Sequence, residues 1–127
     1  MNTYAKDMDI DRLSPEAQER LVAAEAMSME DYQALVQKRK LLRSSYDELQ
    51  NEFDACVTLS APGPAPLGLD WTGDAVFAVP SSVLGTPSYS LPVLEAEGLP
   101  LGLQVMGYAD HDARAFSAAR ALLGLYD

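Results

Sequence analysis

Glycine and proline divide this 127-residue sequence into two unlike parts. All eight glycines and seven of the eight prolines lie after Asp54, whereas neither residue interrupts the run from Ser28 to Phe53. Because proline removes a helical hydrogen bond and glycine weakens a helix interior, the uninterrupted run favours one long helix. We therefore predict a helical part over residues 1–53 and a part made of strands, loops and a helix over residues 54–127.

The helical part carries two helix start signals. Ser14, Pro15 and Glu16 match an N-cap, a proline at the first helical position and an acid in the first turn, so a helix to about Met27 is expected. A second start, close to a capping box, opens at Ser28. Apolar residues then recur mostly three or four apart, which predicts one long helix over Ser28–Phe53.

The second part contains three strand candidates. Ala55–Leu59 is short, apolar and rich in β-forming residues, which is typical of a buried strand. Ser88–Leu94 and Leu101–Met106 are joined by a loop in which Gly98 can supply the positive φ of a hairpin turn. The pattern predicts an antiparallel hairpin and one further strand.

Two more helices are expected in this part. A short one within residues 75–84 would end at Gly85. A longer one follows Asp110, whose carboxylate we expect to cap it. The predicted shared face of that helix consists of Ala113, Phe116, Ala119 and Leu123. The order of elements indicates a small α/β layer. A three-stranded sheet that is apolar on both faces needs more elements to cover it than this chain provides.

The composition excludes several classes of partner. A formal net charge of −10 argues against nucleic acid and against anionic membrane surfaces, because both attract Lys and Arg. The one basic cluster, from Lys38 to Arg43, is flanked by acids and is typical of a solvated helix face. Without a long apolar run or a signal peptide, the sequence predicts a cytoplasmic protein that does not enter the membrane.

The side chains that could act in catalysis or bind a metal lack the neighbouring residues that these roles require. His111, the sole histidine, is typical of an exposed residue at a helix start. Cys56, the sole cysteine, falls in an apolar strand where thiols are inert. Ser82 has no lysine in its half of the chain to activate it. We therefore assign no catalytic residue, no metal ligand and no cofactor.

Three blocks of the sequence stand in a fixed order. Asp54–Pro66 has an acid, a hydrophobic run and a Ser-Ala-Pro loop, and Thr72–Val93 contains Thr-Gly-Asp followed by Gly-Thr-Pro-Ser-Tyr-Ser-Leu-Pro. Glu97–Gly107 reads Glu-Gly-Leu-Pro-Leu-Gly-Leu-Gln-Val-Met-Gly. In this order and spacing they resemble the C-terminal segment of the amidase-signature family. The resemblance covers the chain from about Leu13 onward.

The resemblance implies a role in amide hydrolysis, but the segment that matches does not include the family's catalytic residues. The family uses a Lys–cis-Ser–Ser triad within a Gly/Ser-rich signature, which lies upstream of the matching segment and does not occur in these 127 residues. In relatives the segment that matches residues 72–79 lines the acyl side of the substrate pocket. The candidate substrate-binding residues are therefore Thr72, Asp74, Ala75 and Val79. The resemblance also places the three strands in one sheet.

These observations lead to one fold prediction and three functional hypotheses. The fold is α/β, a single partial domain over residues 1–127 with part of a mixed sheet, a β-hairpin, a long N-terminal helix and a C-terminal helix. The leading hypothesis is a C-terminal fragment or subunit of an amidohydrolase, inactive alone and associated with a complementary amidase chain or with itself. The second is a non-catalytic binding or assembly module derived from an amidase. The third is an independent enzyme that uses His111 or Ser82.

Overall fold

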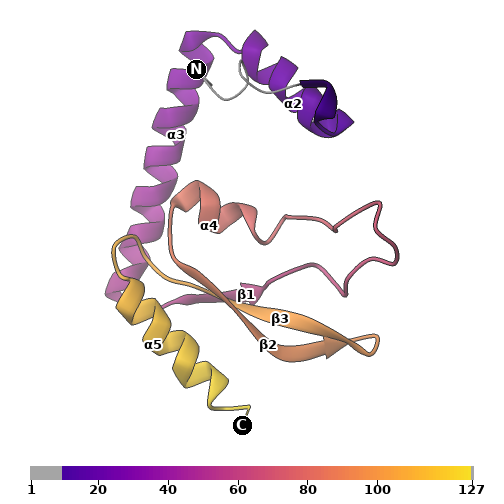
Figure 1. Cartoon of the computed structure of the whole chain (residues 1–127). Helices are drawn as coiled ribbons and strands as arrows, with labels where there is room; N and C mark the ends of the chain where they lie inside the picture. Colours follow the sequence, from indigo (N-terminus) through magenta and orange to yellow (C-terminus); the bar gives the residue numbers. More distant parts are fainter. Residues whose placement is uncertain (1–9, 127) are drawn as a thin grey trace. The chain divides into compact units, whose positions relative to one another are not determined.

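The computed structural model describes residues 10–126, which fall into two compact units divided after Lys38 (Figure 1). The first unit holds a 3-10 turn (Ile10–Arg12), helix α2 (Pro15–Ala26) and the first half of helix α3 (Met29–Glu48). The second unit holds the rest of α3 and every later element. Among the described residues, no helix has both the length and the apolar character needed to cross a membrane.

Both predicted helix starts are confirmed. Ser14 Oγ accepts a hydrogen bond from the backbone N–H of Ala17 at 3.3 Å, and α2 begins at the next residue. Ser28 Oγ accepts from the N–H of Asp31 at 3.0 Å and donates to its carboxylate at 2.6 Å. These bonds satisfy backbone donors that have no partner within the helix. The long helix is shorter than predicted, because α3 ends at Glu48 and tightens into a 3-10 turn over Leu49–Asn51.

In the described residues the sheet lies in the second unit and has three strands in the order β1-β3-β2, with both pairings antiparallel. Strand β1 spans Cys56–Leu59, β2 spans Ser88–Ala96 and β3 spans Leu99–Met106. The predicted hairpin and the α/β fold are confirmed. The prediction of a buried first strand is wrong: among residues 10–126, β1 pairs only with β3, and Val57 in it is 47% exposed. An edge strand lacks the second neighbour that would bury it.

The hairpin turn consists of two residues, Glu97 and Gly98, with φ values of 55° and 77°. Two positive φ values give a turn whose twist matches that of the flanking strands. The expectation for Gly98 is confirmed, and the strands continue further toward the turn than the sequence indicated. Farther along β2 the register shifts between Leu91 and Leu94, around Pro92, which has no N–H to donate to a ladder.

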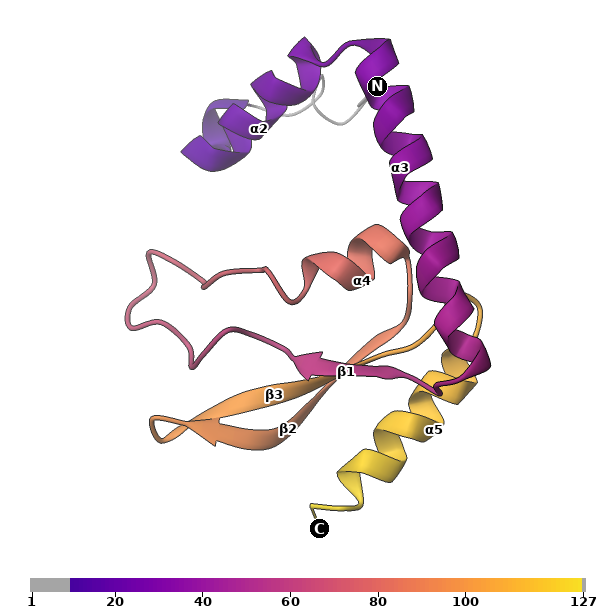
Figure 2. The ribbon, with the colours of Figure 1, turned by 180° about the vertical axis from the view of Figure 1, so that it is seen from behind.

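Helix α5 (Asp112–Leu123) covers one face of the sheet and builds the core (Figures 1 and 2). The core cluster consists of Leu91, Val105 and Ala119. The predicted helix face is wrong except at Ala119. The apolar residues that α5 buries, fully or partly, are Ala115, Ala118, Ala119 and Leu122. Small side chains lie on this face because the backbone at Gly107 approaches the helix closely. A Cβ on Gly107 would collide with that of Ala115.

Two details at α5 depart from the sequence prediction. Asp110 does not cap the helix, because its backbone takes a left-handed conformation (φ 61°) and places it before the N-cap position, which His111 occupies without a capping bond. Phe116, predicted to be part of the shared face, stays 53% exposed. Its ring packs edge-on against Tyr89, with ring centroids 5.9 Å apart.

Arg114 joins α5 to the end of α3. Its Nε donates to Asp54 Oδ1 at 2.9 Å, and its two terminal nitrogens donate to the carbonyls of Gln50 and Phe53. The guanidinium also lies 5.9 Å from the ring centroid of Tyr108. A planar fork suits such a junction, because one side chain satisfies several carbonyls that are left free where a helix ends.

Candidate functional site

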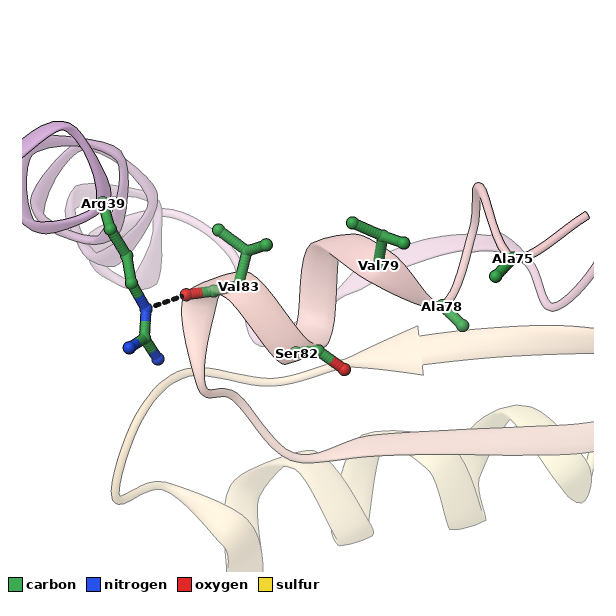
Figure 3. A pocket seen from close by; sticks show the side chains of 6 residues that line it. All are labelled: Arg39, Ala75, Ala78, Val79, Ser82 and Val83. Carbon is green, nitrogen blue, oxygen red and sulfur yellow. Dashed lines mark hydrogen bonds between the residues drawn. The ribbon is translucent and has the colours of Figure 1, made fainter. Parts of the chain in front are cut away.

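An open hollow of about 480 Å³ lies beside the short helix α4 (Val79–Leu84) (Figure 3). Its walls come from the second half of α3, from the segment before α4 and from α4 itself. The lining residues are Arg39, Ala75, Ala78, Val79, Ser82 and Val83. The walls are mainly apolar, with one guanidinium and one hydroxyl as polar groups. Apolar walls with a few polar groups are also the composition of ligand pockets, although this hollow is open on one side.

A side-chain hydrogen bond to the last turn of α4 fixes one end of this wall. Arg39 Nε donates to the carbonyl of Val83 at 2.6 Å (Figure 3). Gly85 ends the helix in the left-handed conformation, with φ 69°, and donates its N–H to the Ser81 carbonyl at 2.8 Å. The predicted end of the short helix is thereby confirmed. Within residues 10–126 the terminal nitrogens of Arg39 make no hydrogen bond, so they remain available to a ligand.

The other end of the wall is fixed from the sheet. Gln104, only 5% exposed, lies on β3 between residues that face α5, so its side chain points to the opposite face of the sheet. Its Nε2 donates to the carbonyl of Phe77 at 3.0 Å. The N–H groups of Ala78 and Val79 both donate to the Ala75 carbonyl, which closes the turn into α4. The apolar wall is thus attached to two different elements.

The structure brings together two of the four predicted site residues. Ala75 and Val79 line the hollow. Asp74 and Thr72 are exposed and are not among the lining residues. The Asp74 carboxylate instead accepts from the N–H of Val76 at 2.9 Å, which shapes the turn that carries Ala75. In this structure the Asp74 side chain therefore stabilises the backbone turn beside the hollow.

The sequence did not indicate four of the six lining residues, Arg39, Ala78, Ser82 and Val83, nor the role of Gln104 behind them. The sequence favours a solvated helix face for Arg39, and for Ser82 it favours an ordinary helix or turn residue over a nucleophile. Gln104 carried one usable signal, because a polar residue between Leu103 and Val105 in an apolar strand needs a buried partner. No local pattern signals that Arg39 meets a carbonyl 44 residues later.

Tyr46 and Tyr108 are not acid–base groups at neutral pH. Burial is the main cause that raises the pKa of Tyr46 above its ordinary value of 10.0, and burial also raises the pKa of Tyr108. Tyr46 donates its hydroxyl to the Met106 carbonyl at 3.3 Å, and the two rings pack with centroids 5.3 Å apart. Both hydroxyls therefore stay protonated and serve packing. Among residues 10–126 no cluster of His, Cys, Asp and Glu is suited to hold a metal ion.

Comparison with known proteins decides the family. A family model described as Amidase matches residues 3–116. The chain belongs to the amidase family. A glutamyl-tRNA(Gln) amidotransferase subunit of Pseudothermotoga lettingae is 32% identical over 132 residues, which cover 95% of this chain and 28% of the relative. The protein of the same name from Clostridium botulinum strain Eklund 17B is 34% identical over 83 residues, or 60% of this chain and 17% of the relative.

A solved structure supports the same assignment. A crystal structure of an amidase superposes on 92% of this amidase-family chain with a TM-score of 0.80 and 29% identity. The chain covers 30% of that amidase. It therefore spans less than a third of the length of the relatives it matches, and the fold described above corresponds to one segment of the family's larger fold.

Proposed function

We propose that this chain forms one wall of the substrate pocket of an amidohydrolase that cleaves carbon–nitrogen amide bonds. The observation that carries the proposal is the hollow beside α4, where Ala75 and Val79 meet Arg39 and Ser82. Residues 72–79 are also the segment whose sequence resembles the pocket wall of the family. The residues proposed to contact substrate are Thr72, Asp74, Ala75 and Val79, together with Arg39 and Ser82.

The chemistry of the hollow defines its part in the reaction. Its apolar walls suit the hydrocarbon part of an acyl group, and the free nitrogens of Arg39 suit an oxygen or a carboxylate on the same substrate. Holding the acyl group still lowers the barrier, because the reacting atoms then meet in one orientation. The nucleophile and its base come from outside these 127 residues, since the Lys–Ser–Ser signature is absent from them.

The partner in this proposal is a complementary amidase part that carries the catalytic residues. Two relatives are named as subunits of an amidotransferase, which supports a role within an assembly. The alternative is a non-catalytic binding or assembly module derived from an amidase. The two differ in one respect: the first requires that changes in the hollow alter turnover, and the second only that they alter binding.

The test replaces the matching segment of the Pseudothermotoga relative with this chain and measures ammonia release from a panel of primary amides. We expect turnover from the hybrid and none from the isolated 127 residues. Arg39→Ala and Val79→Asp should each reduce the turnover of the hybrid roughly tenfold or more, because each removes or disrupts a group that orients the acyl part. Lys40→Ala, one residue along α3 and not a lining residue of the hollow, is the matched control.

Two results contradict the proposal. Turnover by the isolated chain that disappears in Ser82→Ala or His111→Ala would establish an independent enzyme instead. A folded hybrid that binds amides without hydrolysing them would favour the binding module.

A further inference from the structure

The loop between β1 and α4 carries three large apolar side chains on its outer part. Leu67 and Leu69 are fully exposed, at 106% and 98%, and Trp71 is 62% exposed. We refer to these three residues as the apolar tip. Soluble proteins rarely leave a contiguous apolar group uncovered, and tryptophan is enriched among the residues that anchor protein interfaces. The apolar tip therefore has the composition of a binding element.

The loop holds the apolar tip in a defined conformation. Three prolines occupy its first half, and each fixes one backbone dihedral. The ring of Pro66 lies 3.6 Å from the position that a Cβ on Gly73 would take, so the two arms of the loop touch below the tip. The hydrogen bond from the Val76 N–H to Asp74 closes the second arm. A loop restrained in this way loses little conformational entropy on binding.

Charge limits what the apolar tip can contact. No Lys or Arg occurs between Arg43 and Arg114, so every formal charge in that stretch is acidic. Asp70 lies within the tip and Asp74 at its base. Acidic surroundings of this kind favour a partner that carries Lys or Arg around an apolar cleft. They disfavour a second copy of this chain, whose net charge is also −10.

We infer that the apolar tip anchors this chain to the complementary amidase part by inserting Leu67, Leu69 and Trp71 into an apolar cleft rimmed by basic residues. This inference rests on the proposed function, which requires such a part. The occupant follows from the extent of the match, because the chain superposes on only 30% of a solved amidase and the larger share of that fold is available to cover the tip.

The experiment uses the full chain in two formats. In one, it is co-expressed with the portion of the Pseudothermotoga relative that precedes the matching segment; in the other, the two are joined as the hybrid described above. Hydroxyl-radical footprinting with mass spectrometry reads the oxidation of residues 67–71 directly. We expect this oxidation to fall severalfold relative to the isolated chain. Leu125, 78% exposed and outside the loop, should keep its oxidation.

A double variant tests the energetic contribution of the tip. Leu67→Ser combined with Leu69→Ser should weaken the two-chain complex roughly tenfold or more, since two buried leucines are lost. Leu125→Ser, a matched change of an exposed leucine, should leave the affinity unchanged. Asp70→Lys should also weaken the complex, and added salt should reduce the difference between Asp70→Lys and the unaltered chain.

The outcomes separate the anchor from the proposed function. The anchor is overturned if residues 67–71 are oxidised as much in the complex as in the isolated chain, or if the double variant binds as tightly as the unaltered chain. Either result leaves the proposed function intact. Protection of the tip without amide turnover supports the anchor and contradicts the proposed function. Absence of assembly in both formats, or protection in the isolated chain at raised concentration, overturns the anchor.

Discussion

At the scale of single residues, the tightest constraint lies where β3 leaves the sheet and passes under α5. Gly107 is buried there, and a Cβ at this position would collide with Ala115 and lie 3.0 Å from the ring of Pro87. Gly107→Ala should therefore lower the free energy of unfolding by about 1–3 kcal/mol, the usual cost of overpacking. Gly63→Ala, where no atom lies within 4 Å of the new Cβ, should change it by less than about 0.5 kcal/mol. Urea denaturation of both variants checks the difference, and equal losses would contradict the packing described here.

Tyr46 gives a residue-scale prediction about pH. Its pKa is raised in the folded chain, chiefly by burial, whereas the unfolded chain titrates near the ordinary value of 10.0. The unfolded state therefore releases its proton first as pH rises. The contribution of Tyr46 to stability should be constant below about pH 9 and should fall as pH rises through 10. Urea denaturation at pH 8, 10 and 11 measures this fall, which should be smaller in Tyr46→Phe. A Tyr46→Phe chain with the same alkaline loss would assign the effect to other groups.

At the scale of elements, the position of α4 depends on the bond that Gln104 donates to the Phe77 carbonyl. Gln104→Met keeps the volume of the side chain but removes the donor, so the carbonyl loses its partner and stability should fall by about 1–2 kcal/mol. Hydrogen exchange should become faster at the N–H groups of Val79 and Gly85, which close the ends of α4, and stay unchanged in β3. Gln37→Met on the exposed surface of α3 is the matched control. Equal exchange in both variants would show that α4 is held by other contacts.

At the scale of the whole molecule, the described core is small for the apolar surface that remains. The cluster of buried residues consists of Leu91, Val105 and Ala119, and within the described part of the chain β1 and β2 each pair on one side only. Each large apolar side chain left in water forgoes about 1.5–3 kcal/mol, which is a sizeable share of the stability of a domain. We therefore expect the isolated chain to self-associate or to melt over a broad temperature range, with binding of an apolar dye. Sedimentation and thermal melting check this. A monomer with a sharp transition at high temperature and no dye binding would show a self-sufficient domain.

The sequence by itself determined the features that depend on a few neighbouring residues. The caps at Ser14 and Ser28, the helix end at Gly85 and the positive φ at Gly98 follow from side chains and backbone freedom within one turn of the chain. The family resemblance indicated Ala75 and Val79, which line the hollow, because it carries over a whole segment and not a local preference.

Only the tertiary structure decided which groups share the site. Arg39 reaches Val83 across 44 residues and Gln104 reaches Phe77 across 27, and no short pattern encodes such distances. It also decided that α5 buries Ala115 and leaves Phe116 exposed, against the periodicity. The physical reason is close packing: where Gly107 lets two backbones approach, only a methyl group fits between them, so the larger ring is placed outside.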